Sequence, residues 1–255
     1  CEKPLGAAGK THPAPNMPAY KRQRLFAYPP LEEDAAPRGV LGIPRALNLY
    51  ENYPYWATFF RELGFRVVLS PLSELGMESI PSESECYPAK LTHGHVQWLV
   101  NQGIRTIFHP CVFYEHQETP GAQNHFNCPI VVSYPENIRN NVEAVADGDV
   151  RYIRPFIAFT SEKTAADRLV RLCRDEWQIP EREVRAAARA AWDEQKRAKA
   201  DIRAEGARLL AQMEQSGGRG VVLAGRPYHV DPEINHGIPE LIASFGLTVF
   251  TEDSL

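Results

Sequence analysis

The sequence lacks three features that would narrow its function at once: a long apolar run, an excess of basic residues and paired cysteines. Its 28 Lys and Arg residues stand against 32 Asp and Glu residues, and the formal net charge is −4. Nucleic-acid-binding proteins usually carry a strong basic excess, so we expect no nucleic-acid partner. No apolar run approaches the roughly 18–20 residues of a spanning helix, and no charged-then-apolar leader is recognisable. We therefore expect a cytoplasmic protein with no membrane partner.

Cysteine is also scarce, with five residues in 255, and no two of them form a C-x-x-C pair. An odd and dilute set argues against a disulfide-stapled secreted fold and favours reduced thiols. Three of them, Cys86, Cys111 and Cys128, lie in short loop-like motifs between predicted elements. That placement is more typical of a metal or cluster site assembled in three dimensions. A G-x-x-x-x-G-K-[ST] motif is missing too, so we expect no ATP binding through a P-loop.

What the sequence does contain is enough apolar residues, 44%, for a buried core. Residues 1–38 are rich in proline without helix or strand periodicity, which is typical of a linker. Residues 39–150 alternate strand and helix patterns and predict a first α/β domain that carries the three cysteines. Residues 151–217 are helical, and residues 218–255 begin a second α/β unit. We expect this unit to be truncated or completed by pairing with the first, and the chain to be a piece of a longer one.

Hydrophobic periodicity places the individual elements. Because strands and helices alternate, the predicted architecture is a parallel, Rossmann-like sheet with covering helices. The helix over 180–215 is unusually long and rich in Ala, Arg and Glu, as expected of a spacer helix. We predict strands at 39–43, 65–69, 105–108, 129–133, 220–225 and 247–250, and helices at 46–63, 88–100, 163–177, 180–215 and 238–245.

The three loop cysteines occupy positions where ligands are commonly bound. Cys111 follows a predicted strand, and the carboxyl ends of strands in open α/β sheets bind ligands. Cys86 precedes Pro88 by two residues, and proline is favoured at the start of a helix. The partial positive charge of that helix end favours a thiolate and an anionic cluster. Cys128 leads into the predicted strand 130–132. We expect all three side chains to face one cleft.

Other interpretations of these residues stay open. A free cysteine often acts as a small buried hydrophobe, and we assign Cys173, in an apolar helix, to packing. Zinc is an alternative metal because it accepts Cys3His sites, although structural zinc sites usually take ligands in closely spaced pairs. His95 has the helical spacing of a core residue, whereas His109, beside Cys111, is the best candidate for tuning the site. The histidines near the cysteine motifs are His93, His95, His109 and His125.

Further polar residues are candidates for binding or for acid–base roles. Arg45 follows a strand and a turn, a position suited to an anionic ligand or to a surface ion pair. Glu85 and Glu115 lie near the cysteine motifs and are either groups that support the site or solvated loop carboxylates. Arg226 and His229 come directly after a predicted strand, at the end where ligands bind. Their segment either closes over the cysteine site or caps the following helix.

Four segments of the chain carry a resemblance to a known family. They resemble an uncharacterised domain of large bacterial proteins related to the 2-hydroxyacyl-CoA (2-hydroxyglutaryl-CoA) dehydratases and their ATP-dependent activases, the CoA-substrate-specific enzyme activase family. The resemblance covers residues 39–255 and implies an activase-type ATPase domain as partner, in the same polypeptide, and a CoA thioester as substrate. The segments are 42–48, 80–95, 127–136 and 225–238.

The dehydratase relatives bind iron–sulfur clusters through cysteines on α/β domains. The resemblance therefore implies Cys86, Cys111 and Cys128 as ligands of a 4Fe-4S cluster, in a redox module for electron transfer of an anaerobic, ATP-driven dehydratase-like or low-potential reductase system. Three protein ligands would leave one iron open. The alternative is a non-catalytic docking domain with a structural zinc or free thiols. The sequence leaves open whether the chain is part of an enzyme, and the second α/β half of the dehydratase pattern is missing from it.

Overall fold

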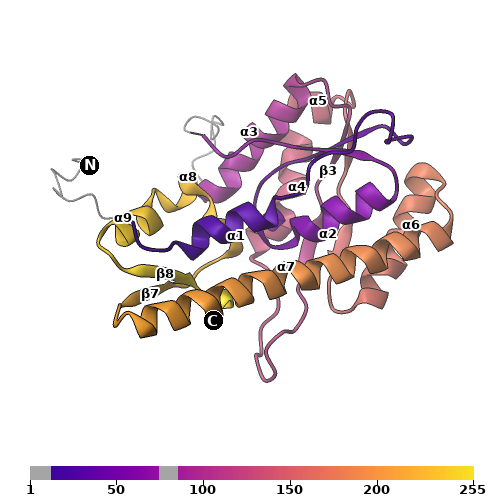
Figure 1. The fold of residues 1–255 in the computed structure, drawn as a ribbon. Helices are drawn as coiled ribbons and strands as arrows, with labels where there is room; N and C mark the ends of the chain where they lie inside the picture. The colour runs from indigo at the N-terminus through magenta and orange to yellow at the C-terminus, as the bar shows by residue number, and fades with distance from the viewer. Residues whose placement is uncertain (1–12, 75–85) are drawn as a thin grey trace.

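A four-stranded parallel sheet forms the centre of the first α/β unit. The structure is a computed structural model that describes residues 13–74 and 86–255 (Figure 1). The sheet has the strand order β2-β1-β3-β5, from Arg66–Leu69, Val40–Ile43, Thr106–Phe108 and Arg151–Ile153. All of its neighbouring strands are parallel. The predicted α/β class and parallel sheet are therefore confirmed.

Helices cover both faces of this sheet because side chains alternate along each strand. Leu41, Ile43 and Phe108 face α2 (Leu49–Glu62), α6 (Glu162–Trp177) and α7 (Glu181–Gln215) in one apolar core. The aromatic stripe of α2 fills this core with the buried rings of Trp56, Phe59 and Phe60.

The opposite face packs against α3 (Tyr87–Asn101), α4 (Pro129–Asn141) and α5 (Glu143–Ala146) in a second apolar core. Gly42 of β1 lies on this face, and a Cβ atom there would come within 2.9 Å of Ile104 Cγ2. Glycine at this position therefore lets α3 and the loop after it approach the strand closely.

The parallel ladder continues past the main sheet after a proline break in each of two strands. β4 (Cys111–Tyr114) follows β3, and β6 (Phe156–Ala158) follows β5, as a second parallel pair. Pro110 and Pro155 separate the paired segments, and proline cannot donate to a ladder. Backbone bonds on either side of the break keep the two sheets connected, from His109 N to Ile153 O and from Cys111 N to Pro155 O, both 2.9 Å.

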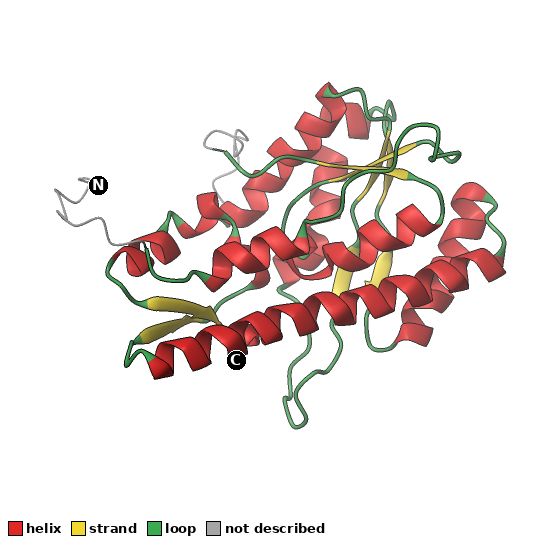
Figure 2. Ribbon diagram, viewed as in Figure 1, coloured by secondary structure: helices red, strands yellow, loops and turns green. Residues whose placement is uncertain are grey.

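The second α/β unit is small and rests on the long helix. Strands β7 (Gly220–Leu223) and β8 (Thr248–Thr251) form a parallel pair, with η1 (Pro227–Val230), α8 (Pro232–Asn235) and α9 (Ile238–Ser244) between them and η2 (Glu252–Ser254) after β8. Helix α7 runs beneath both units (Figure 2). Gly206 of α7 lets η2 approach the helix closely, because a Cβ atom at this position would lie 1.8 Å from Ser254 O.

Several elements differ from the sequence-based prediction, among them the short strands β4, β5 and β6, for which no strand was predicted. Residues 129–133 begin helix α4 and are not a strand, so that prediction is wrong. Their β-branched run favours a strand, but Pro129 at the first turn and the burial of Val131 and Ile138 in the second core favour a helix. Helix α1 (Met17–Leu25) forms within the segment for which no helix was predicted. Its capping residue Asn16 accepts a bond from Ala19 N at 3.2 Å.

No helix in the described ranges, 13–74 and 86–255, combines the length and the apolar character needed to cross a bilayer.

Candidate functional site

The order of strands places two candidate loops beside each other. The chain leaves β1 toward β2 on one side and later returns to β3 on the other side, so the order reverses between β1 and β3. Ligands of open α/β sheets bind at the carboxyl ends of strands at such a reversal. Arg45 follows β1 by two residues, and His109 and Cys111 follow β3. The topology therefore brings the Arg45 loop and the Cys111 loop to the same edge.

Cys111 is fully buried at this edge. Its Sγ atom lies 3.9 Å from Arg154 O, and burial raises the pKa of the thiol to about 12. His109 is buried as well, and its Nδ1 atom lies 2.6 Å from Tyr152 Oη. Burial lowers the pKa of His109 to about 3, so the imidazole is neutral at physiological pH. The Cys111 environment thus favours uncharged side chains unless a cation is bound there.

Cys86 and Cys128 each stand at the start of a helix. Cys86 is the residue that caps α3, and Cys128 caps α4, with Pro88 or Pro129 in the first turn. The predicted position of Cys86 is confirmed, whereas Cys128 precedes a helix where a strand was predicted. Helix N-termini carry partial positive charge and exposed N–H groups, which stabilise anionic ligands.

Both thiols lie near one tyrosine of the second unit. Burial raises the pKa of Tyr228, and the neighbouring Cys128 and Cys86 thiols raise it further. Tyr228 is buried in η1, and it packs in the second core together with Cys128. The turn therefore packs against the start of α4, whereas Cys86 at the start of α3 is exposed.

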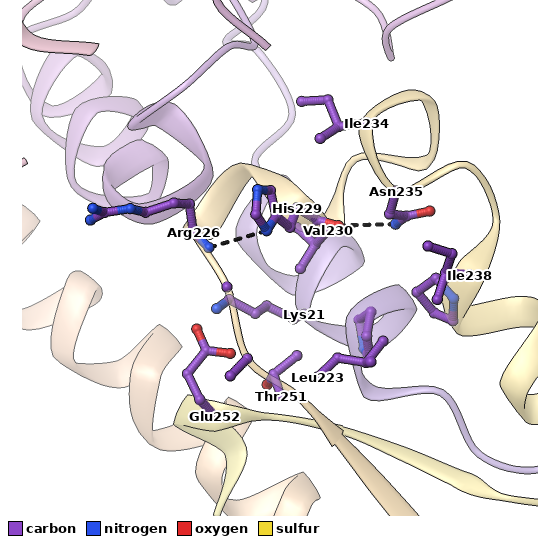
Figure 3. Close-up of a pocket in the computed structure, with 14 residues that line it drawn as sticks. Lys21, Leu223, Arg226, His229, Val230, Ile234, Asn235, Ile238, Thr251 and Glu252 are labelled. Atoms are coloured by element: carbon purple, nitrogen blue, oxygen red, sulfur yellow. Dashed lines mark hydrogen bonds between the residues drawn. The ribbon is translucent and has the colours of Figure 1, made fainter. Parts of the chain in front are cut away.

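Other residues of the segment 226–236 contact the first residue of α3. Tyr87, the first residue of α3, donates to Glu233 Oε1 at 2.6 Å. Its ring stacks against His236 with a centroid separation of 6.2 Å. These contacts hold the segment against the start of α3, and Asn235 Oδ1 accepts from Gly237 N at 2.9 Å at the start of α9, so both roles expected for this segment stay open. Arg226 and His229 lie in the same turn but line a separate cavity (Figure 3).

A chain of buried hydrogen bonds joins the two units below this turn. Asp231 is fully buried and accepts from Ser73 Oγ at 2.5 Å, and also from Tyr50 Oη. Ser73 lies 3.0 Å from His95 Nε2, and Ser70 lies 2.9 Å from His95 Nδ1. Burial lowers the pKa of His95 to about 4. His95 is thus a satisfied core histidine, as its helical spacing predicts.

Arg45 extends this network to the switch-point edge. Its backbone N–H donates to Ser70 Oγ at 2.7 Å, and its Nε donates to Ser70 O at 3.0 Å. The guanidinium lies 4.5 Å from the ring centre of Phe26. Within the described ranges no carboxylate forms an ion pair with it. Burial lowers its pKa.

The described residues do not contain a preassembled metal site. Among them, no three His, Cys, Asp or Glu side chains are grouped so that they could hold a metal ion. Cys86 and Cys128 lie at two helix starts, whereas Cys111 is buried on β4, and a ligand set made of these three cysteines stays a prediction. Glu85 lies outside the described residues.

Comparison with protein families gives a match over most of the chain. The family model of the CoA enzyme activase uncharacterised domain matches residues 40–255. The chain belongs to this family. The resemblance seen in the four sequence segments is thereby confirmed. Searches of the curated proteins and of the solved structures found no match to this activase-related domain.

Glu115 of the activase-related domain is held in a way that its sequence position did not predict. Its carboxyl group accepts from three asparagine amides, Asn48 at 3.2 Å, Asn52 at 3.1 Å and Asn127 at 2.8 Å. Burial raises its pKa to about 7, and the nearby Glu51 raises it as well. Glu115 is therefore not a freely solvated carboxylate, and its partner Asn127 directly precedes Cys128.

Sequence reasoning singled out Asp231 of this domain, within the polar segment 226–236 that follows β7, but missed Tyr228. Both lie in the segment 225–238 that carries the family resemblance, and an aromatic and an acidic residue directly after a strand were the available signal. Their roles depend on contacts with residues far away in the sequence.

Proposed function

We infer that this activase-related domain is the iron–sulfur redox module of an ATP-driven 2-hydroxyacyl-CoA dehydratase-like or low-potential reductase system. One observation carries the proposal: Cys86 and Cys128 cap two adjacent helices and lie near the same buried tyrosine, Tyr228. Family membership supports the relation to CoA enzyme activases. An activase-type ATPase domain as partner and a CoA thioester as substrate are part of the proposal.

In this proposal Cys86, Cys111 and Cys128 hold a 4Fe-4S cluster. When bound, such a cluster accepts and releases single electrons at a potential that the surrounding hydrogen bonds and exposure set. The helix starts at Cys86 and Cys128 stabilise its negative charge through their N–H groups. Cys111 fits less well, because a buried thiol with a raised pKa loses its proton only when a cation compensates the charge.

The residues around the thiols have defined tasks in this proposal. Tyr228 packs with Cys128 in the second core and limits the access of water to that thiol, whereas Cys86 is exposed. Arg45 places a partly buried cation at the switch-point edge, where an anionic substrate group would be attracted. His109 stays neutral and bound to Tyr152, so it orients its neighbours without adding charge.

Metal analysis of the anaerobically reconstituted chain tests the proposal. We expect about four irons and four sulfides per chain, with a brown colour, for the unaltered protein. C86S, C111S and C128S should each lose most of the iron. C173S is the matched control, because Cys173 is buried in α6 and packs in the core of the first unit, so its iron content should be unchanged.

Three outcomes would contradict the proposal or a part of it. A colourless protein that holds one zinc ion, with zinc lost in C86S and C128S, would support the structural-zinc docking domain instead. Full iron content in C86S would show that the helix-start thiols are not ligands. Loss of iron in C86S and C128S but not in C111S would remove Cys111 from the ligand set and overturn that part of the proposal.

A further inference from the structure

A short antiparallel ribbon closes the base of the loop between β4 and α4. The loop leaves the body of the molecule below α7 in Figure 1 and returns to it at the start of α4. At its base Tyr114 and Phe126 form an antiparallel bridge. Beside this bridge the backbone N–H of Asn127 donates to Phe113 O at 3.1 Å. The chain that returns from the loop is therefore paired with the end of β4.

The register of this ribbon brings together the chain segments of two cysteines. Along antiparallel strands, one step forward on one strand is matched by one step backward on the other. The bridge and the backbone bond share one register, which leads Cys128 to the level of Val112. Val112 directly follows Cys111 in the sequence. The backbone that carries Cys128 therefore lies beside the strand that carries Cys111.

The side chain of Asn127 fastens the two segments to each other. Its Nδ2 atom donates to Val112 O at 3.0 Å and to Glu115 Oε1 at 2.8 Å. A side-chain amide has two N–H donors, so these two bonds use both of them. Together with the backbone bond to Phe113 O, three hydrogen bonds hold Asn127 on β4. The residue directly before Cys128 is thus fixed in place.

Glu115 anchors Asn127 to the rest of the first unit. Its Oε1 atom also accepts from Asn48 at 3.2 Å and from Asn52 at 3.1 Å, and we call these four residues the asparagine clamp. Asn48 caps α2 and ends the loop after β1, which also carries Arg45. The asparagine clamp therefore joins the β1 loop, the end of β4 and the start of α4 at the switch-point edge.

We propose that Asn127 is a positioning residue of the cysteine site: its three bonds set the place of Cys128 relative to Cys111. The proposal rests on the proposed function, because the two thiols are ligands only there. Groups that orient the ligands of a metal site in advance lower the entropy cost of binding, and they tune the bound group. Cys86 is exposed and makes none of these bonds, so the asparagine clamp orders two of the three thiols.

Alkylation of the reduced, iron-free chain by iodoacetamide tests this proposal at each thiol by mass spectrometry. We expect N127A to raise the rate at the half-buried Cys128 about tenfold, because the segment before it loses two side-chain bonds and opens more often. N127S, whose hydroxyl has one donor in place of two, should raise it by less. The rate at Cys86 should stay unchanged. Cys173 is fully buried in α6, so its modification would reveal a variant that unfolds globally.

N141A is the matched control, because Asn141 Nδ2 donates to the backbone oxygen of Asn137 at 2.8 Å at the other end of α4. Cys128 should react in N141A as it does in the unaltered chain. After anaerobic reconstitution with iron and sulfide, N127A should shift the reduction potential and the electron paramagnetic resonance spectrum of the cluster. N141A should leave both unchanged.

The proposal is overturned if Cys128 reacts equally fast in folded N127A or N127S and in the unaltered chain, or if N141A raises the rate as much. An unchanged potential and spectrum in iron-loaded N127A would also reject the positioning role. A chain that takes up no iron refutes the proposed function instead, and the alkylation rates then still decide whether Asn127 holds Cys128 in place.

Discussion

Replacement of Asp231 by alanine is expected to destabilise the contact between the two α/β units. The carboxylate is fully buried and accepts from Tyr50 Oη, from Ser73 Oγ at 2.5 Å and from Glu233 N at 2.8 Å. Each buried donor that loses its acceptor costs about 1–3 kcal/mol. Removal of the buried carboxylate also offsets part of this loss of stability, because the cost of desolvating its charge disappears. We expect D231A to lower the free energy of unfolding by about 3 kcal/mol.

Urea denaturation followed by circular dichroism measures this change. D231N keeps an acceptor for Glu233 N, so its free energy of unfolding should fall by less, about 1–2 kcal/mol. D149A is the control, because Asp149 is exposed on the loop before β5, and it should stay within about 0.5 kcal/mol of the unaltered chain. A loss below 1 kcal/mol in D231A would refute the reasoning, since the three donors would then be satisfied without the carboxylate.

The remaining predictions concern single buried groups elsewhere in the fold. Burial raises the pKa of Glu115 to about 7, so the folded chain keeps a proton that the unfolded chain releases, and stability should fall as pH rises from about 4.5 to 7. Urea titrations at pH 5 and pH 8 should show a difference in the free energy of unfolding on the order of 2 kcal/mol, and E115Q should remove this difference. An unchanged difference in E115Q would exclude Glu115 as its source. K199A should lower the free energy of unfolding by about 2–3 kcal/mol, because it leaves Glu51 and Glu118 without their cation. K196A is the control, because Lys196 is exposed on the same helix, and it should leave stability unchanged. Equal losses in the two variants would argue against the ion pairs. G206A should lower the melting temperature although alanine favours helices, because its Cβ would meet Ser254 O; a higher melting temperature would show that α7 and η2 are not in contact.

Most of the fold was predictable from periodicity and turn residues. The strands at β1, β2, β3, β7 and β8 and the helices α2, α3, α6, α7 and α9 lie where the hydrophobic pattern placed them, within a few residues. The elements that were missed are short or atypical. β4, β5 and β6 have three or four residues each, too few for a period, and α1 owes its helix to a cap and to burial against the second unit.

The candidate site was predictable only in part. Cys86 at a helix start follows from Pro88, and Cys111 after β3 follows from the strand pattern. The error at Cys128 has a physical cause, because Ile130 and the two valines after it favour a strand until the packing of α4 is known. The sequence left open whether Glu115 supports the site or is a solvated loop carboxylate, because two of its asparagine partners lie more than 60 residues away.

The sequence by itself determined the features that depend on neighbouring residues: the α/β class, most element positions, the family and the helix start at Cys86. Proline, glycine and side-chain periodicity act over a few residues, so they are visible in the chain. Only the tertiary structure decided that Tyr228 lies near both Cys86 and Cys128, and that Asp231 reaches Tyr50, 181 residues away. Such contacts form between residues distant in sequence, and packing of the whole fold selects them.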